Sequence, residues 1–172
     1  MIELQKITPN NFEAVLELNV TEAQESFVDD PYHCLAEAYV NLTNKDIPPL
    51  LFAITSGYEV IGLAMMEYHK RNDKKFPYEE LEHLHETYGD KAIYELSRLI
   101  IDEAHQGKGL GKAALAKVIE YLRTFPLGQA DAVFLICMTE NQAARKLFAS
   151  AGFEEMALQV FDDEVFARLP LS

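Results

Sequence analysis

Apolar and polar positions along the chain follow two different periods, which predict an α/β protein. Several segments alternate with the period of a half-buried strand or form the short apolar runs of a buried one. These segments are residues 2–7, 50–55, 59–68, 92–101, 132–137, 153–160 and 164–169. Ser56 and Gly57 separate the second and third segments, a pattern typical of a β-hairpin. Gly62 inside the third segment indicates a β-bulge.

Apolar residues at helical spacing lie between these strands. The predicted helices cover about residues 12–18, 32–42, 107–124 and 141–150. Asn10 and Asn11 precede the first as a cap, and Gly152 follows the last as a stop. The order β-α-α-β-β-β-α-β-α-β-β predicts one α/β domain over residues 1–172 with a mixed sheet. A polar and highly charged stretch, about 69–91, is expected to be an insertion before the central strand.

Composition limits the classes of protein that fit. The chain has 172 residues, 49% of them hydrophobic, and a formal net charge of −13. This charge disfavours a general nucleic-acid binder, which needs a basic surface. No apolar run approaches the roughly 18 residues of a membrane span, and residues 1–5 do not resemble a signal peptide. The two cysteines form no disulfide framework, which favours a reduced, cytoplasmic protein. From the net charge and the absence of a long apolar run, we expect neither nucleic-acid nor membrane partners.

The stretch EAHQGKGLGKAAL, residues 103–115, carries the clearest chemical signal. It follows a predicted strand and opens a predicted helix. Backbone N–H groups at such a helix start bind anions, and glycines let phosphate oxygens approach the main chain. Lys108 and Lys112 can add positive charge. The spacing matches neither the P-loop nor the dinucleotide-binding pattern.

Two motifs resemble those of the GNAT superfamily of acetyl-CoA-dependent N-acetyltransferases. Residues 106–111, QGKGLG, resemble its Gln/Arg-x-x-Gly-x-Gly/Ala signature. Residues 141–148, NQAARKLF, followed by Gly152 and Phe153, resemble its second signature, Asn-x-x-Ala-x-x-Leu-Tyr with a later Gly-Phe. The resemblance implies a mostly antiparallel mixed sheet flanked by helices, with acetyl-CoA bound at a splay between central strands.

The resemblance also implies which residues hold acetyl-CoA. The pyrophosphate is expected at the backbone amides of the glycine loop, and the pantetheine arm along the end of the central strand. The implied residues are Leu99, Ile100, Ile101, Gln106, Gly107, Lys108, Gly109, Leu110, Gly111, Lys112, Asn141 and Phe148. Asn141 can equally serve only as a helix N-cap. No metal is expected, because His83 and His85 alone make a weak metal motif.

Glu95 is the candidate general base. It interrupts an apolar stretch and lies 11 residues before Gln106, where some GNAT enzymes carry a catalytic carboxylate. The alternative is that Glu95 faces solvent or pairs with Arg98. The family signature usually ends in Tyr, the group that can protonate the leaving thiolate, whereas this chain has Phe148. No catalytic acid is therefore assigned.

Residues 16–20, 27–28, 35–39, 51–54, 60–65 and 96–102, together with Gln24, resemble bacterial spermine/spermidine acetyltransferases within the superfamily. Residues 7–44 contain no Lys or Arg. The amine acceptor is therefore expected to be a polyamine such as spermidine or spermine. Glu17, Glu25, Asp29 and Asp30 are the expected substrate-binding carboxylates. Three alternatives stay open: a merely solvated acidic face, another acceptor (a protein N-terminus, a lysine or a drug), and a non-catalytic binding module. Whether the protein forms a homodimer is also left open.

Overall fold

A computed structural model describes residues 1–44, 47–70, 92–156 and 163–171. Within these ranges one seven-stranded sheet has the order β1-β2-β3-β4-β5-β7-β6. The strands are β1 (Ile2–Lys6), β2 (Leu50–Ser56), β3 (Glu59–His69), β4 (Ile93–Ile101), β5 (Ala132–Met138), β6 (Glu154–Glu155) and β7 (Glu164–Pro170). All neighbours pair antiparallel except β4 and β5, which are parallel. The predicted fold class is confirmed.

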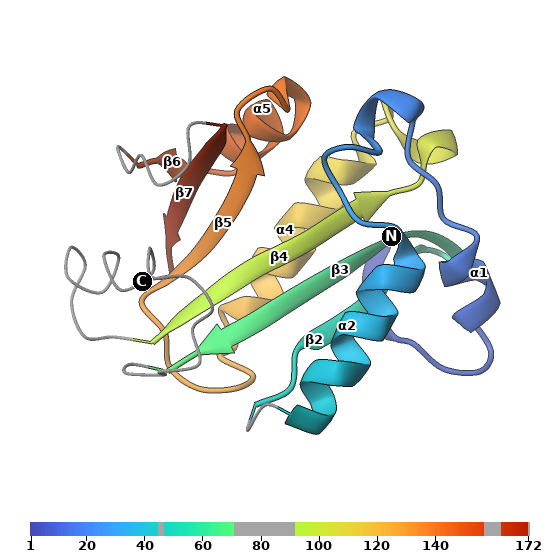
Figure 1. Ribbon diagram of the computed structural model, residues 1–172, viewed down its shortest axis with the longest axis horizontal. Coiled ribbons are helices and arrows are strands. Elements are labelled where there is room, and N and C mark those ends of the chain that lie inside the picture. The colour runs from blue at the N-terminus through green and yellow to red at the C-terminus, as the bar shows by residue number, and fades with distance from the viewer. Residues whose placement is uncertain (45–46, 71–91, 157–162, 172) are drawn as a thin grey trace.

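Helices cover both faces of the sheet (Figure 1). They are α1 (Phe12–Leu16), α2 (Pro31–Asn44), α4 (Leu110–Leu122) and α5 (Gln142–Ser150), with 3-10 turns at Glu22–Gln24 and Glu103–His105. One core packs Leu115, Val118 and Leu122 of α4 against the sheet, with α5 residues at its edge. A second core packs Val15 and Cys34 from α1 and α2 against the opposite face. The helix order is the predicted one.

Strands β4 and β5 pair over only two residue positions. Tyr94 pairs with Val133 and Glu95 with Phe134, and no further pair follows in this parallel register. Each strand continues beyond that point, β4 to Ile101 and β5 to Met138. The strands therefore diverge after Glu95, which leaves one edge of β4 without a neighbouring strand (Figure 1).

Two bulges shape the central strands. The register between β2 and β3 shifts next to Gly62, at the position expected from the sequence, and the register between β3 and β4 shifts at Ser97. At Gly62 the backbones come unusually close, because an added Cβ would lie 2.2 Å from the carbonyl oxygen of Ile100. Glycine is therefore required there for close approach.

The largest boundary differences from the prediction concern α4 and β6. Helix α4 begins at Leu110, after a 3-10 turn and the four residues 106–109, and not at residue 107. Strand β6 is only two residues long. The predicted insertion 69–91 lies almost wholly outside the described residues, as do His83 and His85, while His69 is the last residue of β3.

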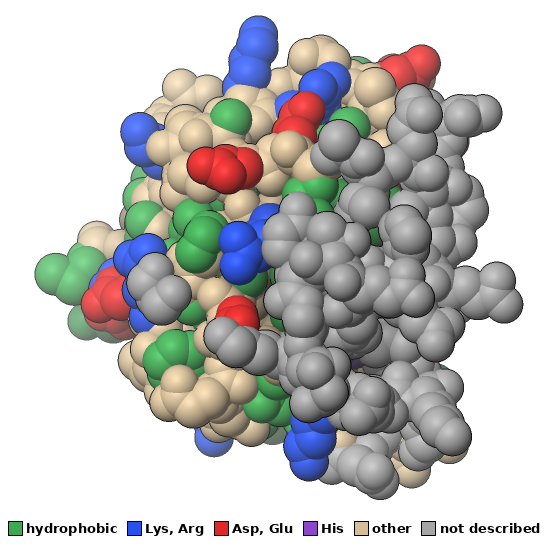
Figure 2. Space-filling model, turned by 90° about the vertical axis from the view of Figure 1, so that its left-hand side faces the viewer, with side chains coloured by type: hydrophobic (Ala, Val, Ile, Leu, Met, Phe, Trp, Pro, Cys, Tyr) green, Lys and Arg blue, Asp and Glu red, His purple; other side chains and the backbone are tan. Residues whose placement is uncertain are grey.

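Charge is mixed on the face that Figure 2 presents, where lysine, arginine and acidic side chains are interspersed. In the part of the chain that the structure describes, no helix is long and apolar enough to cross a membrane.

Candidate active site

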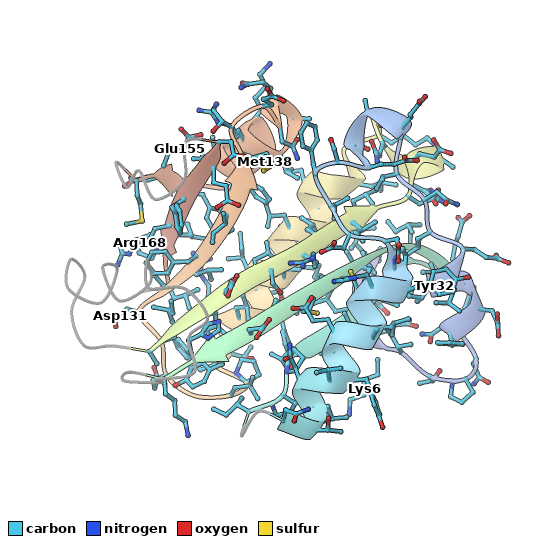
Figure 3. The ribbon with its side chains drawn as sticks, in the orientation of Figure 1. Lys6, Tyr32, Asp131, Met138, Glu155 and Arg168 are labelled. Atoms are coloured by element: carbon cyan, nitrogen blue, oxygen red, sulfur yellow. The ribbon has the colours of Figure 1, made fainter. Side chains whose placement is uncertain are left out.

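The divergence of β4 and β5 opens a cavity of about 570 Å³. Its walls come from β4 (residues 95–99), β5 (135–138), the start of β7 and the segment 25–29 before α2. Met138, labelled in Figure 3, ends β5 beside α5 and lines this cavity. A second cavity of about 230 Å³ continues from it toward the glycine loop. Leu99, Asn141, Ala144 and Phe148 line both cavities, so the two form one continuous groove.

The glycine loop presents free backbone donors to this groove. Gly107 and Gly109 have φ of +71° and +76°, a left-handed backbone that side chains disfavour. Gly109 is the N-cap of α4, and the first helical bond runs from Ala113 N to Gly109 O at 3.2 Å. The amides of Leu110, Gly111 and Lys112 precede that bond and point out of the helix start. This arrangement fits a phosphate.

Side chains of the same loop mainly hold its shape. The Gln106 amide donates to Ile101 O at 2.8 Å and to Gln24 Oε1 at 2.9 Å. The Lys108 ammonium donates to Ala104 O at 2.6 Å. Lys112 is exposed on the first turn of α4. Gln106 and Gly107 also line the cavity by the loop.

The other expected cofactor residues surround the same groove. Leu99, Ile100 and Ile101 all line the cavity by the loop. Asn141 Oδ1 accepts a hydrogen bond from Ala144 N at 3.1 Å, which makes it the N-cap of α5 as well as a lining residue. Phe148 packs edge-to-face on Phe153 with ring centroids 5.8 Å apart. The smaller cavity, mostly apolar and running along an unpaired strand edge to a helix N-terminus, fits an extended chain that carries a phosphate group.

Glu95 lies at the point where β4 and β5 separate, and it lines the larger cavity. Its Oε2 is 2.9 Å from Nε2 of His69 on β3. The side chains of Glu95 and His69 are 17% and 9% exposed. The partner of Glu95 is therefore His69 and not Arg98, and its carboxyl group borders the cavity. Nothing in the local sequence pointed to His69, because 26 residues separate it from Glu95.

Arg98 instead pairs with acidic residues from the N-terminal region at the wall of the larger cavity. Its Nε donates to Asp29 Oδ2 at 2.9 Å, and its terminal nitrogen contacts Glu37 of α2 at 3.3 Å. Burial lowers the pKa of the Arg98 guanidinium, but the carboxylates of Asp29 and Glu37 outweigh it and leave the pKa raised. The guanidinium therefore stays charged and neutralises part of the acidic N-terminal region.

The expected substrate carboxylates have different surroundings. Glu25 and Asp29 line the larger cavity, and Asp29 is the one paired with Arg98. Asp30 caps α2 by accepting from His33 N at 2.8 Å, and it lines a neighbouring cavity of about 420 Å³ under residues 25–31. Glu17 is exposed at the end of α1 and lines none of these three cavities. The structure brings only part of the predicted set together.

Two further carboxylates, Asp163 and Glu164, line the larger cavity from the start of β7. Sequence reasoning missed them because they follow a loop at the far end of the chain. Among the described residues that line the larger cavity, five carry a carboxylate and one, Arg98, carries a positive charge. The carboxylates are Glu25, Asp29, Glu95, Asp163 and Glu164. The cavity is therefore acidic.

The described residues that line the two cavities include no tyrosine. Cys137 lines the larger one, and burial raises the pKa of its thiol, with Arg145 opposing that effect. Within the described ranges no group of three or more His, Cys, Asp or Glu side chains could hold a metal ion.

Comparisons with known proteins agree with this geometry. Residues 12–153 match the model of the acetyltransferase (GNAT) family. The chain is 27% identical over 153 residues to a spermine/spermidine N(1)-acetyltransferase of Bacillus subtilis, covering 89% of this chain and 88% of that protein. It is 32% identical over 66 residues, 38% of each chain, to the N-alpha-acetyltransferase RimI of Mycobacterium tuberculosis. The yncA protein of Salmonella typhimurium, solved with its cofactor acetyl-CoA, superposes with a TM-score of 0.62 at 17% identity, covering 100% of this chain and 95% of that one.

The fold and the groove define an acyltransferase that uses a CoA thioester. The chain belongs to the GNAT family of acetyltransferases, and it is an acetyl-CoA-dependent N-acetyltransferase.

Proposed function

We propose that this enzyme acetylates a primary amine of a polyamine such as spermidine or spermine. The observation that carries the proposal is the acidic cavity where β4 and β5 diverge, whose described lining residues include five carboxylates and one already paired cation. A polycation gains more from such a cavity than a monoamine, because its distal ammonium groups also interact with carboxylates. The similarity to a bacterial spermine/spermidine acetyltransferase supports the same acceptor. A cytoplasmic location fits the two free cysteines but stays a proposal.

The smaller cavity of the groove, on the side of the glycine loop, supports a cofactor site next to the acidic cavity. When bound, acetyl-CoA supplies the acetyl group as a thioester. The amides of Leu110, Gly111 and Lys112 would hold its pyrophosphate, and the free edge of β4 at residues 99–101 would pair with its extended arm. Asn141 and Phe148 would border the arm from the α5 side, since both line the shared part of the groove.

Glu95 would accept the proton that the substrate ammonium loses before attack. Amines are mostly protonated at neutral pH, so a base in contact with the reacting nitrogen raises the fraction that can react. Glu95 is mostly buried, carries one hydrogen bond and borders the acceptor cavity. Glu25 and Asp163, both exposed at the cavity wall, would hold the amines that do not react.

An amine panel tests the acceptor directly. Release of free thiol from acetyl-CoA is measured with spermine, spermidine, monoamines, amino acids and peptides with free N-termini under one condition. We expect polyamines to have the highest kcat/KM. The KM for spermidine should rise with ionic strength, because salt screens partly exposed charges with a Debye length of roughly 8 Å at about 0.15 M. A peptide N-terminus turned over faster than any polyamine would contradict the acceptor and leave the acetyltransferase assignment intact.

Paired variants locate the polyamine site. Glu25→Gln combined with Asp163→Asn removes two cavity carboxylates that are not committed to Arg98. We expect a spermidine KM raised by roughly 3- to 10-fold and an unchanged affinity for acetyl-CoA. Glu17→Gln is the matched control, since Glu17 is an exposed carboxylate outside the cavities. An equal effect of the control would indicate overall charge and not a site.

A further inference from the structure

The contact between His69 and Glu95 is set by the register of the central strands. Glu95 pairs with Glu67 across β3 and β4, and His69 pairs with Ile93. Because side chains two positions apart in a strand lie on the same face, His69 is the diagonal neighbour of Glu95. The resulting Nε2–Oε2 distance of 2.9 Å is that of a hydrogen bond.

Glu95 borders the cavity, and His69 lies behind it in the protein interior. Glu95 lines the larger cavity, whereas His69 is not among the lining residues and is buried, with 7% of the whole residue exposed. His69 therefore contacts the carboxylate from the side away from the substrate. It engages Oε2 and leaves Oε1 available toward the cavity. A carboxyl group bonded through one oxygen cannot rotate freely, so the direction of the other oxygen is fixed.

Other described groups near Glu95 come from three strands. From β3 the paired residue is Glu67, which has interactions of its own. From β4 the nearest cation, Arg98, is committed to Asp29 and Glu37. From β5 the paired residue is Phe134, which brings no charge. The His69 Nε2 is thus the group in described contact with the Glu95 carboxyl group, and it is the donor when that carboxyl group is ionised, because a carboxylate only accepts.

We propose that His69 is a positioning residue for the general base, and that its Nε2–H holds the ionised Glu95 carboxylate aimed at the substrate ammonium. The inference rests on the proposed role of Glu95 in acetyl transfer. The substrate nitrogen gives its proton to Glu95 Oε1, the nitrogen lone pair becomes free to attack, and His69 keeps its own proton throughout. His69 does not touch the substrate.

Replacing His69 with Gln or with Asn, two amide side chains of different length, tests this role. The side-chain nitrogen of Gln can occupy the place of Nε2, whereas the shorter Asn reaches only the place of Nδ1. We expect His69→Gln to keep kcat within about threefold of the parent and His69→Asn to lose roughly 10- to 100-fold, the effect of one hydrogen bond to a charged group. The two variants should have the same acetyl-CoA dissociation constant and the same melting temperature.

A double-mutant comparison gives a readout that a structural role would not change. In a Glu95→Gln background His69→Asn should cost nothing further, since both changes remove the same function.

Equal turnover for His69→Gln and His69→Asn would overturn the positioning role and leave the base assignment standing. Full turnover in Glu95→Gln would overturn the base assignment itself. The two failures are therefore distinguishable.

Discussion

Arg98 on β4 donates from Nε to Oδ2 of Asp29 at 2.9 Å, and it thereby links the open strand edge to the segment that lines the larger cavity. The same guanidinium donates to its own strand through Ser97 O at 2.8 Å and contacts Glu37 of α2. Arg98 therefore joins the central strand, the segment 25–29 and α2. This wall of the larger cavity includes a cation supplied by a distant strand.

Replacing Arg98 with Met should loosen this wall. The change leaves Asp29 and Glu37 without their cation, and we expect a loss of about 1–2 kcal/mol in unfolding free energy, discounted because the Asp29 side chain is 40% exposed. The KM for the amine should rise several-fold while acetyl-CoA affinity changes little. Urea unfolding and initial rates measure both. Lys117→Met, which breaks the exposed pair with Glu120, is the control and should cost under about 0.5 kcal/mol.

Replacing Gly109 with Ala should weaken cofactor binding and stability together. The backbone at Gly109 has φ of +76°, and a side chain there costs about 1–2 kcal/mol. The strain would shift the N-terminal amides of α4, so acetyl-CoA affinity measured by calorimetry should fall at least about tenfold.

Gly111→Ala is the matched control for Gly109. Its φ is not positive, and an added Cβ would meet only Ile101 and Leu147 at ordinary distances of 3.7 and 3.8 Å. We expect a stability equal to or above that of the parent, since Ala favours helices over Gly by roughly 1 kcal/mol. Gly111→Val should instead crowd these two neighbours. Parent-like cofactor affinity in folded Gly109→Ala would refute the assignment of the pyrophosphate to this loop.

Gly62→Ala should be among the most destabilising small substitutions in the chain. The new Cβ would lie 2.2 Å from a backbone oxygen, which cannot move aside without opening the β3–β4 ladder. We expect a loss of about 3 kcal/mol or more in chemical unfolding. Gly57→Ala is the comparison variant. Its backbone has φ of +66° and nothing lies within 4 Å of the new Cβ, so this change introduces backbone strain without crowding. A smaller loss at residue 62 than at residue 57 would contradict the close approach.

Cys34 should make a stability contribution that disappears at high pH. Burial raises the pKa of its thiol from 9.0 to about 11, with a smaller opposing effect from Arg98. Because the folded pKa is the higher one, the contribution is complete below pH 9 and is lost as the pH rises through about 11. The difference in unfolding free energy between the parent and Cys34→Ala should therefore shrink over that window. A constant difference would show that the thiol does not titrate there.

The order of elements and the cofactor loop were determined by the sequence alone. Strand and helix periods are local properties, so residues 92–101 and 132–137 predicted β4 and β5 closely. The need for glycine at residues 107 and 109 was also visible, because a left-handed turn before a helix leaves a signature within a few residues. The two GNAT motifs lie within such short segments.

The tertiary structure alone decided which side chains meet. His69 reaches Glu95 across 26 residues, and Arg98 reaches Asp29 across 69. Asp163 and Glu164 reach the cavity only because β7 pairs with β5. These contacts depend on strand register and on the separation of β4 from β5, and one step in register would turn each side chain to the opposite face of the sheet. Register is fixed by the packing of the whole core, and a local stretch of sequence does not contain that information.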